Sequence, residues 1–278
     1  MSYPMTKAQK AEYRIGWFST GRDDAARDLL RAVWSSIKEG ELKAEIAFVF
    51  SNREPGEATE SDSFFELVHS YRIPLICLSS RKFQEIVGEG WRGEFEKKAM
   101  RRLEGFLPRH DLCVLAGYML IIGEEMCRRY PMINLHPAAP SGPKGTWQEV
   151  IWRLIEEGAE ETGVMMHLVT PQLDEGPAVT YCTFSIRGEP FDRYWDDIRG
   201  RSIAEVKKQE GDRNHIFREI RRYGLAREFP LIIATIKAFI EGRVRIAGER
   251  VVDSNEKPVK GYNLSGEIDQ RVKGTLAK

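Results

Sequence analysis

The amino-acid sequence predicts an α/β protein in which a mostly parallel central sheet is covered by helices on both faces. Short apolar runs of strand length recur along the chain, and amphipathic segments of helix length separate them. Strands that alternate with helices in this way are typical of a parallel sheet with two covered faces. With 278 residues the chain suffices for one large domain with an extension, or for two small domains.

The expected strands follow one another through the first half of the chain. They span residues 14–19, 44–50, 73–78, 111–117 and 132–136. Helix-length segments such as SDSFFELVHSY and FEKKAMRRLEGFL lie between them. Two later apolar runs, residues 162–169 and 178–186, flank a loop rich in Pro and Gly, and this arrangement predicts an antiparallel hairpin.

The composition changes near residue 190, where charged helical segments replace the strands. We therefore expect a main domain over residues 13–190 and a helical extension over residues 191–245 that completes it. Residues 246–278 are polar and rich in turn formers, which predicts a polar C-terminal tail packed on the surface.

Charge and composition limit the classes of partner. Lys+Arg and Asp+Glu both number 42, so the net charge is zero and nothing favours nucleic acid or a membrane surface. No apolar stretch is long enough to span a bilayer, and no secretory signal is evident, so we expect a cytoplasmic monomer or homodimer acting on small molecules. The four cysteines are far apart without CxxC spacing, which disfavours disulfides and structural zinc.

The most informative segment is Ile133-Asn134-Leu135-His136-Pro137. Side chains alternate between the two faces of a strand, so Asn134 and His136 share one face while Ile133 and Leu135 pack on the other. Pro137 cannot continue a central strand, so His136 lies at the carboxyl end of this one. Ligand sites of parallel sheets collect at that edge.

A second polar element is the loop of residues 171–177, which can hold Asp174 against His136. An amide, an imidazole and a carboxylate suit direct acyl transfer between two bound substrates, and no metal is required. Asn134 and a protonated His136 can stabilise an oxyanion, while Asp174 favours the charged imidazole and helps to take a proton. The residue types alone are equally compatible with a polar strand end that has no catalytic role.

The order and spacing of several motifs resemble the folate-dependent formyltransferase family. These motifs are NLHP, SGPKG, the helical segment TWQEVIWRLIEEG, TGVMMHLV and LDEGP. The strand RIGWFS, the tripeptide Ser51-Asn52-Arg53 and VLAGYM resemble the glycinamide ribonucleotide formyltransferases within that family. The resemblance implies a Rossmann-like formyltransferase fold, with residues 13–190 as the catalytic domain and Asn134, His136 and Asp174 as the catalytic residues.

The resemblance also implies that 10-formyltetrahydrofolate is the co-substrate. The expected folate-binding residues are Tyr118, Met119, Leu120, Ile121, Ile122, Leu173, Glu175 and Gly176. His167 stands at the position of a family histidine, and we assign it a secondary role because a core histidine with satisfied hydrogen bonds is the simpler interpretation.

The turn after the first strand departs from the family pattern. Glycinamide ribonucleotide formyltransferases usually carry Gly-x-Gly-Ser-Asn, where helix amides bind phosphate, whereas this chain has Thr20-Gly21-Arg22-Asp23-Asp24. Two carboxylates would repel phosphate, and Thr20 with Asp23 suggests a helix-capping pair, while Arg22 can supply a compensating charge. The candidate acceptor-binding residues are Thr20, Gly21, Arg22, Asp23 and Arg53.

Two further differences concern arginines. Leu120 stands where the family usually has an arginine. A basic cluster of Arg218, Arg221, Arg222 and Arg227 can receive an acceptor phosphate, although a solvated helix face is the expected default.

The resemblance implies transfer of a formyl group from 10-formyltetrahydrofolate to a primary amine, with glycinamide ribonucleotide in purine biosynthesis as the best candidate. Another amine, such as an amino sugar nucleotide, is an alternative because the phosphate turn is altered. Hydrolysis of the formyl donor is disfavoured because related deformylases carry a small domain before the catalytic part. A folate-binding relative without turnover is a fourth possibility, against which the presence of all three catalytic residue types argues.

Overall fold

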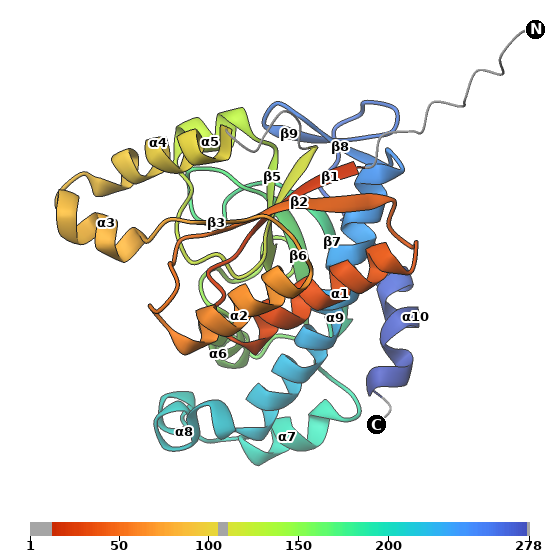
Figure 1. The fold of residues 1–278 in the computed structure, drawn as a ribbon. Helices are drawn as coiled ribbons and strands as arrows, with labels where there is room; N and C mark the ends of the chain where they lie inside the picture. Colours follow the sequence, from red (N-terminus) through yellow and green to blue (C-terminus); the bar gives the residue numbers. More distant parts are fainter. Residues whose placement is uncertain (1–12, 105–110, 277–278) are drawn as a thin grey trace, which may run out of the picture.

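The computed structural model describes residues 13–104 and 111–276, which form an eight-stranded sheet with helices on both faces (Figure 1). The first strands are β1 (Tyr13–Phe18), β2 (Ala44–Ser51), β3 (Leu75–Cys77), β4 (Leu112–Leu115) and β5 (Met132–His136). The remaining ones are β6 (Glu161–Leu168), β7 (Ala178–Ser185) and β10 (Tyr262–Asn263). All predicted strands are present, with small shifts at their ends.

The strand order is β10-β7-β6-β5-β4-β1-β2-β3. Neighbours are parallel except for β5 with β6 and β6 with β7, which are antiparallel. The predicted mostly parallel sheet and the late antiparallel hairpin are therefore confirmed. The carboxyl ends of β1, β2, β4 and β5 meet at one edge of the sheet, because these four strands are parallel.

Helices cover each face through a separate apolar cluster. On one face, Ile15, Leu112 and Ile133 pack with α1 (Asp24–Lys38), α2 (Thr59–Ser70) and the long helix α9 (His215–Ile240). On the other, Phe18, Phe48 and Cys113 pack with α4 (Trp91–Glu104) and α5 (Glu124–Arg129), beyond which α3 (Ser80–Val87) projects (Figure 1). The predicted helix FEKKAMRRLEGFL corresponds to the end of α4, and its last three residues lie outside the described residues.

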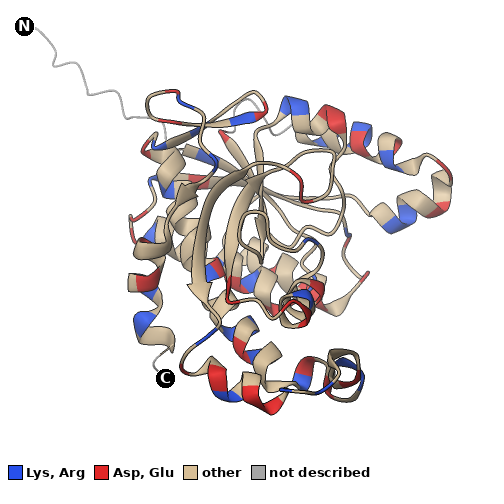
Figure 2. Ribbon diagram, turned by 180° about the vertical axis from the view of Figure 1, so that it is seen from behind, with Lys and Arg blue, Asp and Glu red and all other residues tan. Residues whose placement is uncertain are grey.

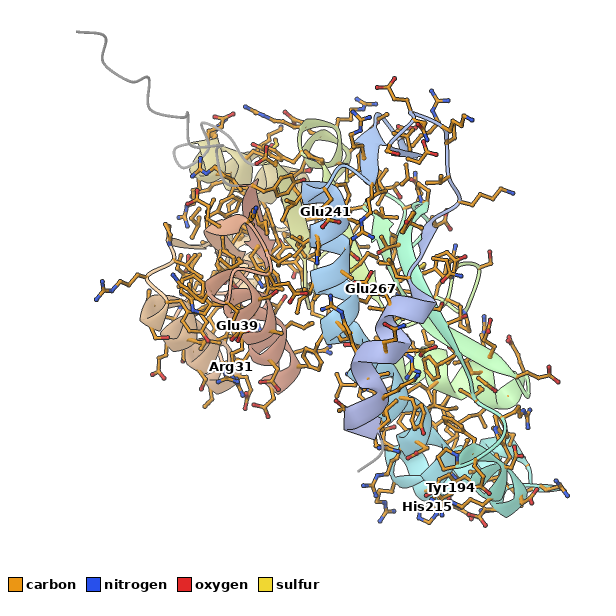
Figure 3. The ribbon with its side chains drawn as sticks, turned by 90° about the vertical axis from the view of Figure 1, so that its right-hand side faces the viewer. Arg31, Glu39, Tyr194, His215, Glu241 and Glu267 are labelled. Atoms are coloured by element: carbon orange, nitrogen blue, oxygen red, sulfur yellow. The ribbon has the colours of Figure 1, made fainter. Side chains whose placement is uncertain are left out.

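The helical extension contains α7 (Phe191–Asp197), α8 (Ile203–Glu210) and the first half of α9. Together with α6 (Trp147–Glu156) these helices enclose a third apolar cluster that includes Phe191, Ile216 and Phe217. Because α6 belongs to the main domain, the extension shares this cluster with that domain. Figure 3 shows Tyr194 and His215 at this end of the molecule, with Glu241 at the opposite end of α9.

The prediction that residues 246–278 form a polar tail is wrong for residues 246–276, which the structure describes. Residues 246–276 contribute to a hairpin of β8 (Val244–Ala247) and β9 (Arg250–Asp253), to the edge strand β10 and to helix α10 (Ser265–Leu276). Leu264, Ile268 and Val272 are buried in the main apolar cluster, because the few apolar residues of this segment recur at helical spacing beneath a polar surface.

Charged residues of both signs are mixed along the helices and loops, whereas the central strands carry few of them (Figure 2). This distribution agrees with the balanced composition, in which Lys+Arg and Asp+Glu both number 42. Among the described residues no helix is long and apolar enough to cross a membrane.

Candidate active site

The carboxyl end of β5 presents Asn134 and His136 on the same face of the sheet. Ile133 and Leu135 pack against the opposite apolar cluster, as the alternation of a strand predicts. In the antiparallel pairing with β6, Asn134 lies opposite His167 and His136 lies opposite Met165. The antiparallel pairing of β6 with β5 thus brings a second histidine, His167, to the polar face.

His136 is only 2% exposed, yet both ring nitrogens have polar neighbours. Its Nε2 lies 3.0 Å from the carbonyl oxygen of Pro143, which can only accept, so Nε2 carries hydrogen. Its Nδ1 lies 3.6 Å from Oδ2 of Asp174. In the neutral ring the free lone pair is therefore on Nδ1, beside a carboxylate that stabilises an arriving proton.

Asp174 reaches this position from the loop between β6 and β7. Its backbone has a φ of 52°, a left-handed conformation that few residues other than glycine, Asn and Asp adopt. Its carboxylate also accepts a hydrogen bond from the backbone of Gly145. A Cβ at Gly176 would overlap the carbonyl oxygen of Leu168, so glycine is needed where the loop returns to the sheet.

Nε2 of His167 lies between two partners, 3.1 Å from Nδ2 of Asn134 and 3.4 Å from Oδ1 of Asp174. Nδ1 of this ring donates to the carbonyl of Leu168, so the neutral ring accepts from the Asn134 amide. A protonated ring would instead donate to Asp174, and the Asn134 amide would have to turn. His167 therefore orients the amide and carboxylate that flank it.

The charges of the site follow from burial and from these contacts. Burial lowers the pKa of His136, and the Pro143 carbonyl and Asp174 only partly oppose it. Burial alone would raise the pKa of Asp174, but the contacts of its carboxylate with His167 and His136 and the hydrogen bond from the Gly145 backbone bring it below its usual value. Both directions favour a neutral His136 beside an ionised Asp174 in the free protein, and the protonated imidazole expected at the oxyanion remains a prediction about the reacting state.

A cavity of about 210 Å³ lies between the loop that follows β4 and helix α4. Tyr118, Leu120, Ile121 and Ile122 line it, together with Pro171 from the loop that carries Asp174. Met119, Ile121 and Leu173 are 43 to 58% exposed, which is unusual for large apolar side chains in this protein. Of the other expected folate residues, Glu175 pairs with Lys144 at 2.9 Å and Gly176 packs against β6.

Three contributors to the site were not predicted. Glu96 and Arg92 of α4 line the cavity, and the Pro143 carbonyl binds His136. Arg92 and Glu96 are four residues apart on one helix face, but nothing in the sequence shows which face meets the cavity. Pro143 lies in SGPKG and acts through its main-chain carbonyl. Every residue has such a carbonyl, so the sequence does not indicate which one contacts His136.

Comparison with known proteins decides the family. Residues 24–189, more than half of the chain, match the family model described as formyl transferase.

The chain belongs to the formyl transferase family.

Its relatives have more than one activity in their names. The chain is 25% identical over 237 residues to phosphoribosylglycinamide formyltransferase of Escherichia coli (strain K12). This match covers 84% of this chain and 92% of the relative. It is 33% identical over 142 residues to formyltetrahydrofolate deformylase of Bacillus subtilis (strain 168), covering 50% of this chain and 41% of the relative.

Solved structures show the same fold. The phosphoribosylglycinamide formyltransferase of Coxiella burnetii superimposes with a TM-score of 0.65 at 22% identity, covering 91% of this chain and 99% of that one. A formyltetrahydrofolate deformylase of Burkholderia mallei gives 0.60 at 22% identity, with 87% and 71% covered. The predicted formyltransferase fold is thereby confirmed.

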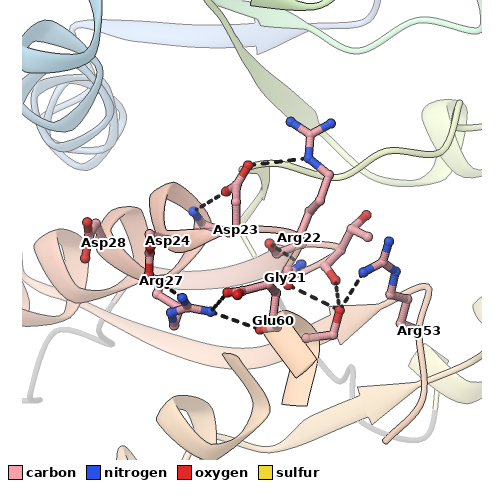
Figure 4. Close-up of polar contacts among 12 residues, drawn as sticks. Gly21, Arg22, Asp23, Asp24, Arg27, Asp28, Arg53 and Glu60 are labelled. Atoms are coloured by element: carbon pink, nitrogen blue, oxygen red, sulfur yellow. Dashed lines mark hydrogen bonds and ion pairs between the residues drawn. The ribbon is translucent and has the colours of Figure 1, made fainter. Parts of the chain in front are cut away.

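The turn after β1 in this formyl transferase is built by side chains (Figure 4). Asp23 caps α1 by accepting from the backbone N–H of Ala26 at 3.1 Å. Thr20 takes no part in the cap: its hydroxyl donates to Oδ1 of Asn52 at 2.7 Å and accepts from the N–H of Met119 at 2.9 Å. The predicted Thr20–Asp23 capping pair is therefore wrong for Thr20, which instead links the turn to the loop after β4.

The other candidate residues of this turn are closely packed. Gly21 has a φ of 62°, and a Cβ there would lie 2.9 Å from Phe64. Arg22 contacts Oδ2 of Asp23 at 3.4 Å and the sulfur of Met119 at 3.2 Å. Arg53 donates to the hydroxyl of Ser61 at 2.9 Å.

Three arginines of the basic cluster on α9 are paired with acids. Arg221 lies 2.5 Å from Glu228, Arg222 lies 2.7 Å from Glu219, and Arg227 lies 2.8 Å from Asp269 of α10. Their charges are thus compensated within the protein, but Arg227 is only 5% exposed, so the expected solvated helix face is wrong for this residue.

Proposed function

We propose that this formyl transferase transfers the formyl group of 10-formyltetrahydrofolate to a primary amine, with glycinamide ribonucleotide as the first acceptor to test. The observation that carries the proposal is the grouping of Asn134, neutral His136 and ionised Asp174 at the carboxyl edge of the sheet. The relationship to the Escherichia coli phosphoribosylglycinamide formyltransferase supports the choice of acceptor.

The folate is assigned to the cavity between the loop after β4 and helix α4. Its apolar lining from Tyr118 to Ile122 suits the flat pterin ring, and its contact with Pro171 places it next to the Asp174 loop. The exposed side chains of Met119 and Leu173 lie in the two loops that border it, where a bound ligand would cover them.

The trio can carry both proton transfer and charge stabilisation. The amine nitrogen forms a bond to the formyl carbon, and the carbonyl electrons move to oxygen. An amide nitrogen has two N–H groups, so Asn134 can donate one to this oxyanion while the other faces His167. Nδ1 of His136 accepts the proton that the amine loses, and Asp174 stabilises the resulting imidazolium.

Collapse of the intermediate completes the reaction. The carbonyl re-forms, the bond from the formyl carbon to N10 of the folate breaks, and N10 takes the proton from His136. The products are the formylated amine and tetrahydrofolate, and the protein returns to its starting protonation state.

Hydrolysis is the second candidate, because the chain is 33% identical to a formyltetrahydrofolate deformylase over the matched region. Water would replace the amine as nucleophile, His136 would accept its proton, and formate would be released. The same trio can perform both reactions, so the two candidates differ only in the nucleophile, an amine or water, that attacks the formyl carbon.

The test follows the formyl donor and its products together. Purified protein is incubated with 10-formyltetrahydrofolate alone, with glycinamide ribonucleotide, and with an amino sugar nucleotide, and mass spectrometry identifies formate or the formylated amine. Formylated amine with acceptor-dependent loss of donor is the expected result. Formate without any acceptor selects the hydrolase, and donor binding without loss refutes both enzymes.

A further inference from the structure

An ion pair joins the two loops that border the catalytic trio. One loop, residues 137–146, links β5 to α6, and the other, residues 169–177, links β6 to β7. Lys144 of the first loop lies 2.9 Å from Oε1 of Glu175 in the second. Among the described residues no other ion pair connects these two loops.

The sequence neighbours of this pair contact the catalytic groups. The carbonyl of Pro143 accepts from Nε2 of His136 at 3.0 Å, and the backbone N–H of Gly145 donates to Asp174. Asp174 itself comes directly before the acidic member of the pair. A displacement of either charged residue is therefore transmitted along one peptide unit to a group that holds the trio.

The loop that carries Asp174 has little backbone support of its own. Among the described residues, the backbone of residues 170–176 makes hydrogen bonds only within the loop. The Gln172 carbonyl accepts from the N–H of Glu175 at 3.4 Å and from the hydroxyl of Thr170 at 3.0 Å. Asp174 also has a φ of 52°, a conformation that the surrounding structure must maintain. Side-chain contacts therefore decide where its carboxylate lies.

The separation of His136 and Asp174 makes their interaction sensitive to the loop position. Nδ1 and Oδ2 are 3.6 Å apart, which is longer than a hydrogen bond. A charged pair of this kind bonds at roughly 2.7–2.9 Å, so a loop movement of about 1 Å makes or loses the contact. The titratable groups that face the His136 ring are Asp174 and His167, whose ring centroid lies 6.0 Å away.

We propose that the Lys144–Glu175 pair positions Asp174 against His136 and thereby sets the proton affinity of the imidazole. The inference rests on the proposed reaction, in which His136 accepts a proton. Among the described residues no hydrogen bond or ion pair joins Lys144 or Glu175 to the trio, so both are positioning residues. An exposed pair adds little to the stability of the whole fold, so its effect is expected on the loop.

The sign of one substitution separates positioning from a direct effect of charge. Lys144→Met removes a positive charge, which by itself would raise the pKa of His136. If the pair positions Asp174, the same substitution releases the carboxylate from the ring and lowers the pKa of His136 instead. The two explanations therefore predict opposite results for the same variant.

NMR titration of the free protein measures this pKa without folate or turnover. Isotope labelling and sequential assignment identify His136 among the five histidines. Lys144→Met should lower the pKa of His136 by about 0.5–1, a fraction of the roughly 1–3 by which a close opposite charge changes a pKa. Lys144→Arg keeps the charge and should leave the pKa near that of the wild type. Exchange of the two charges, Lys144→Glu with Glu175→Lys, should restore most of the wild-type value.

The matched control is the Lys97–Glu94 pair of α4. Its distance is also 2.9 Å, and its side chains are 54% and 58% exposed against 55% for both members of the inter-loop pair, but it joins two residues of one helix. Lys97→Met should leave the pKa of His136 and the turnover unchanged.

Turnover supplies the second measurement. Lys144→Met should lower kcat by about 10- to 100-fold, because misplacing a catalytic group by about 1 Å costs on the order of 10²-fold. Circular dichroism checks that each variant is folded, and Lys144→Arg against Lys144→Met keeps the test valid if the charge-exchanged protein is not.

An unchanged or raised pKa of His136 in Lys144→Met overturns the assignment, whether or not the protein transfers formyl groups. A lowered pKa that persists in the folded charge-exchanged protein also overturns it, because the pairing is then not the cause. A pKa that is lowered by Lys144→Met and restored by the exchange, in a protein that transfers no formyl group, supports the pair and overturns only the proposed function.

Discussion

The two halves of the carboxyl edge are built on different physical principles. Around β5 and β6, Asn134, His136 and Asp174 are fixed by burial, strand pairing and a tight loop. Around the turns after β1 and β2, Arg22, Asp23 and Arg53 lie among ion pairs and capping contacts. In the proposed reaction the buried half carries the chemistry, and the charged half is where the acceptor can be changed without disturbing it.

The largest expected effect comes from removing the imidazole. His136→Ala should lower kcat by about 10²- to 10⁴-fold, because Nδ1 is the proton acceptor in the proposed reaction. Folate affinity should stay within about tenfold, roughly 1.4 kcal/mol, since the ring does not line the cavity. Steady-state kinetics and direct titration of folate measure the two quantities.

His215→Ala is the control for that variant, because His215 is an exposed histidine of the extension (Figure 3). It should leave both quantities unchanged. Full turnover in His136→Ala would show that His136 is not the proton acceptor, and the buried half would then not carry the proposed chemistry.

The next effect concerns pH. The proposed reaction requires an unprotonated His136, so kcat/KM should fall as the pH drops through the pKa of this ring. Burial lowers that pKa, which places the acid limb below about 6.5. Asp174→Asn removes the carboxylate that raises the pKa of His136, so the limb should move to still lower pH while the plateau rate falls by about 100-fold.

Asparagine is the suitable replacement because it tolerates the positive φ at this position. Asp212→Asn, at an exposed position of the extension, is the control. A limb that moves to higher pH in Asp174→Asn would show that the carboxylate does not act on His136.

A third variant tests the loop that holds Asp174. Gly176→Ala would drive a methyl group into the Leu168 carbonyl, so the loop must shift away from β6. We expect a loss of about 1–3 kcal/mol in the free energy of unfolding and a large loss of activity. Gly224→Ala is matched, since nothing lies within 4 Å of a Cβ there and the residue is inside α9. Urea unfolding of both variants measures the difference.

Several features of the site could be predicted from local rules. The alternation of β5 placed Asn134 and His136 together, and Pro137 marked the end of that strand, because both depend only on backbone geometry. His167 is different. Its proximity to Asn134 depends on the antiparallel register of β5 with β6, which no local pattern specifies.

The corrections have a common cause in long-range packing. The pKa of His136 is lowered because burial, which is a property of the whole fold, outweighs the nearby carboxylate. The C-terminal segment was expected to be a tail because its surface is polar. Its buried residues Leu264, Ile268 and Val272 contact distant elements of the main core, so their role is visible only once the sheet is assembled.

The smallest expected effect separates stability from specificity in the charged half. Asp23→Ala removes the cap of α1 and should cost about 0.5–2 kcal/mol of unfolding free energy. Asp23→Asn keeps a side-chain oxygen for the Ala26 N–H and should retain nearly all of the stability. Because the same variant removes a negative charge beside Arg22, it should also strengthen binding of phosphate-terminated amines.

Asp28→Ala on the exposed face of α1 is the control for stability. Equal unfolding free energies for Asp23→Ala and the wild type would mean that the carboxylate is not held for capping, and its presence beside the acceptor turn would then have to be explained by binding alone.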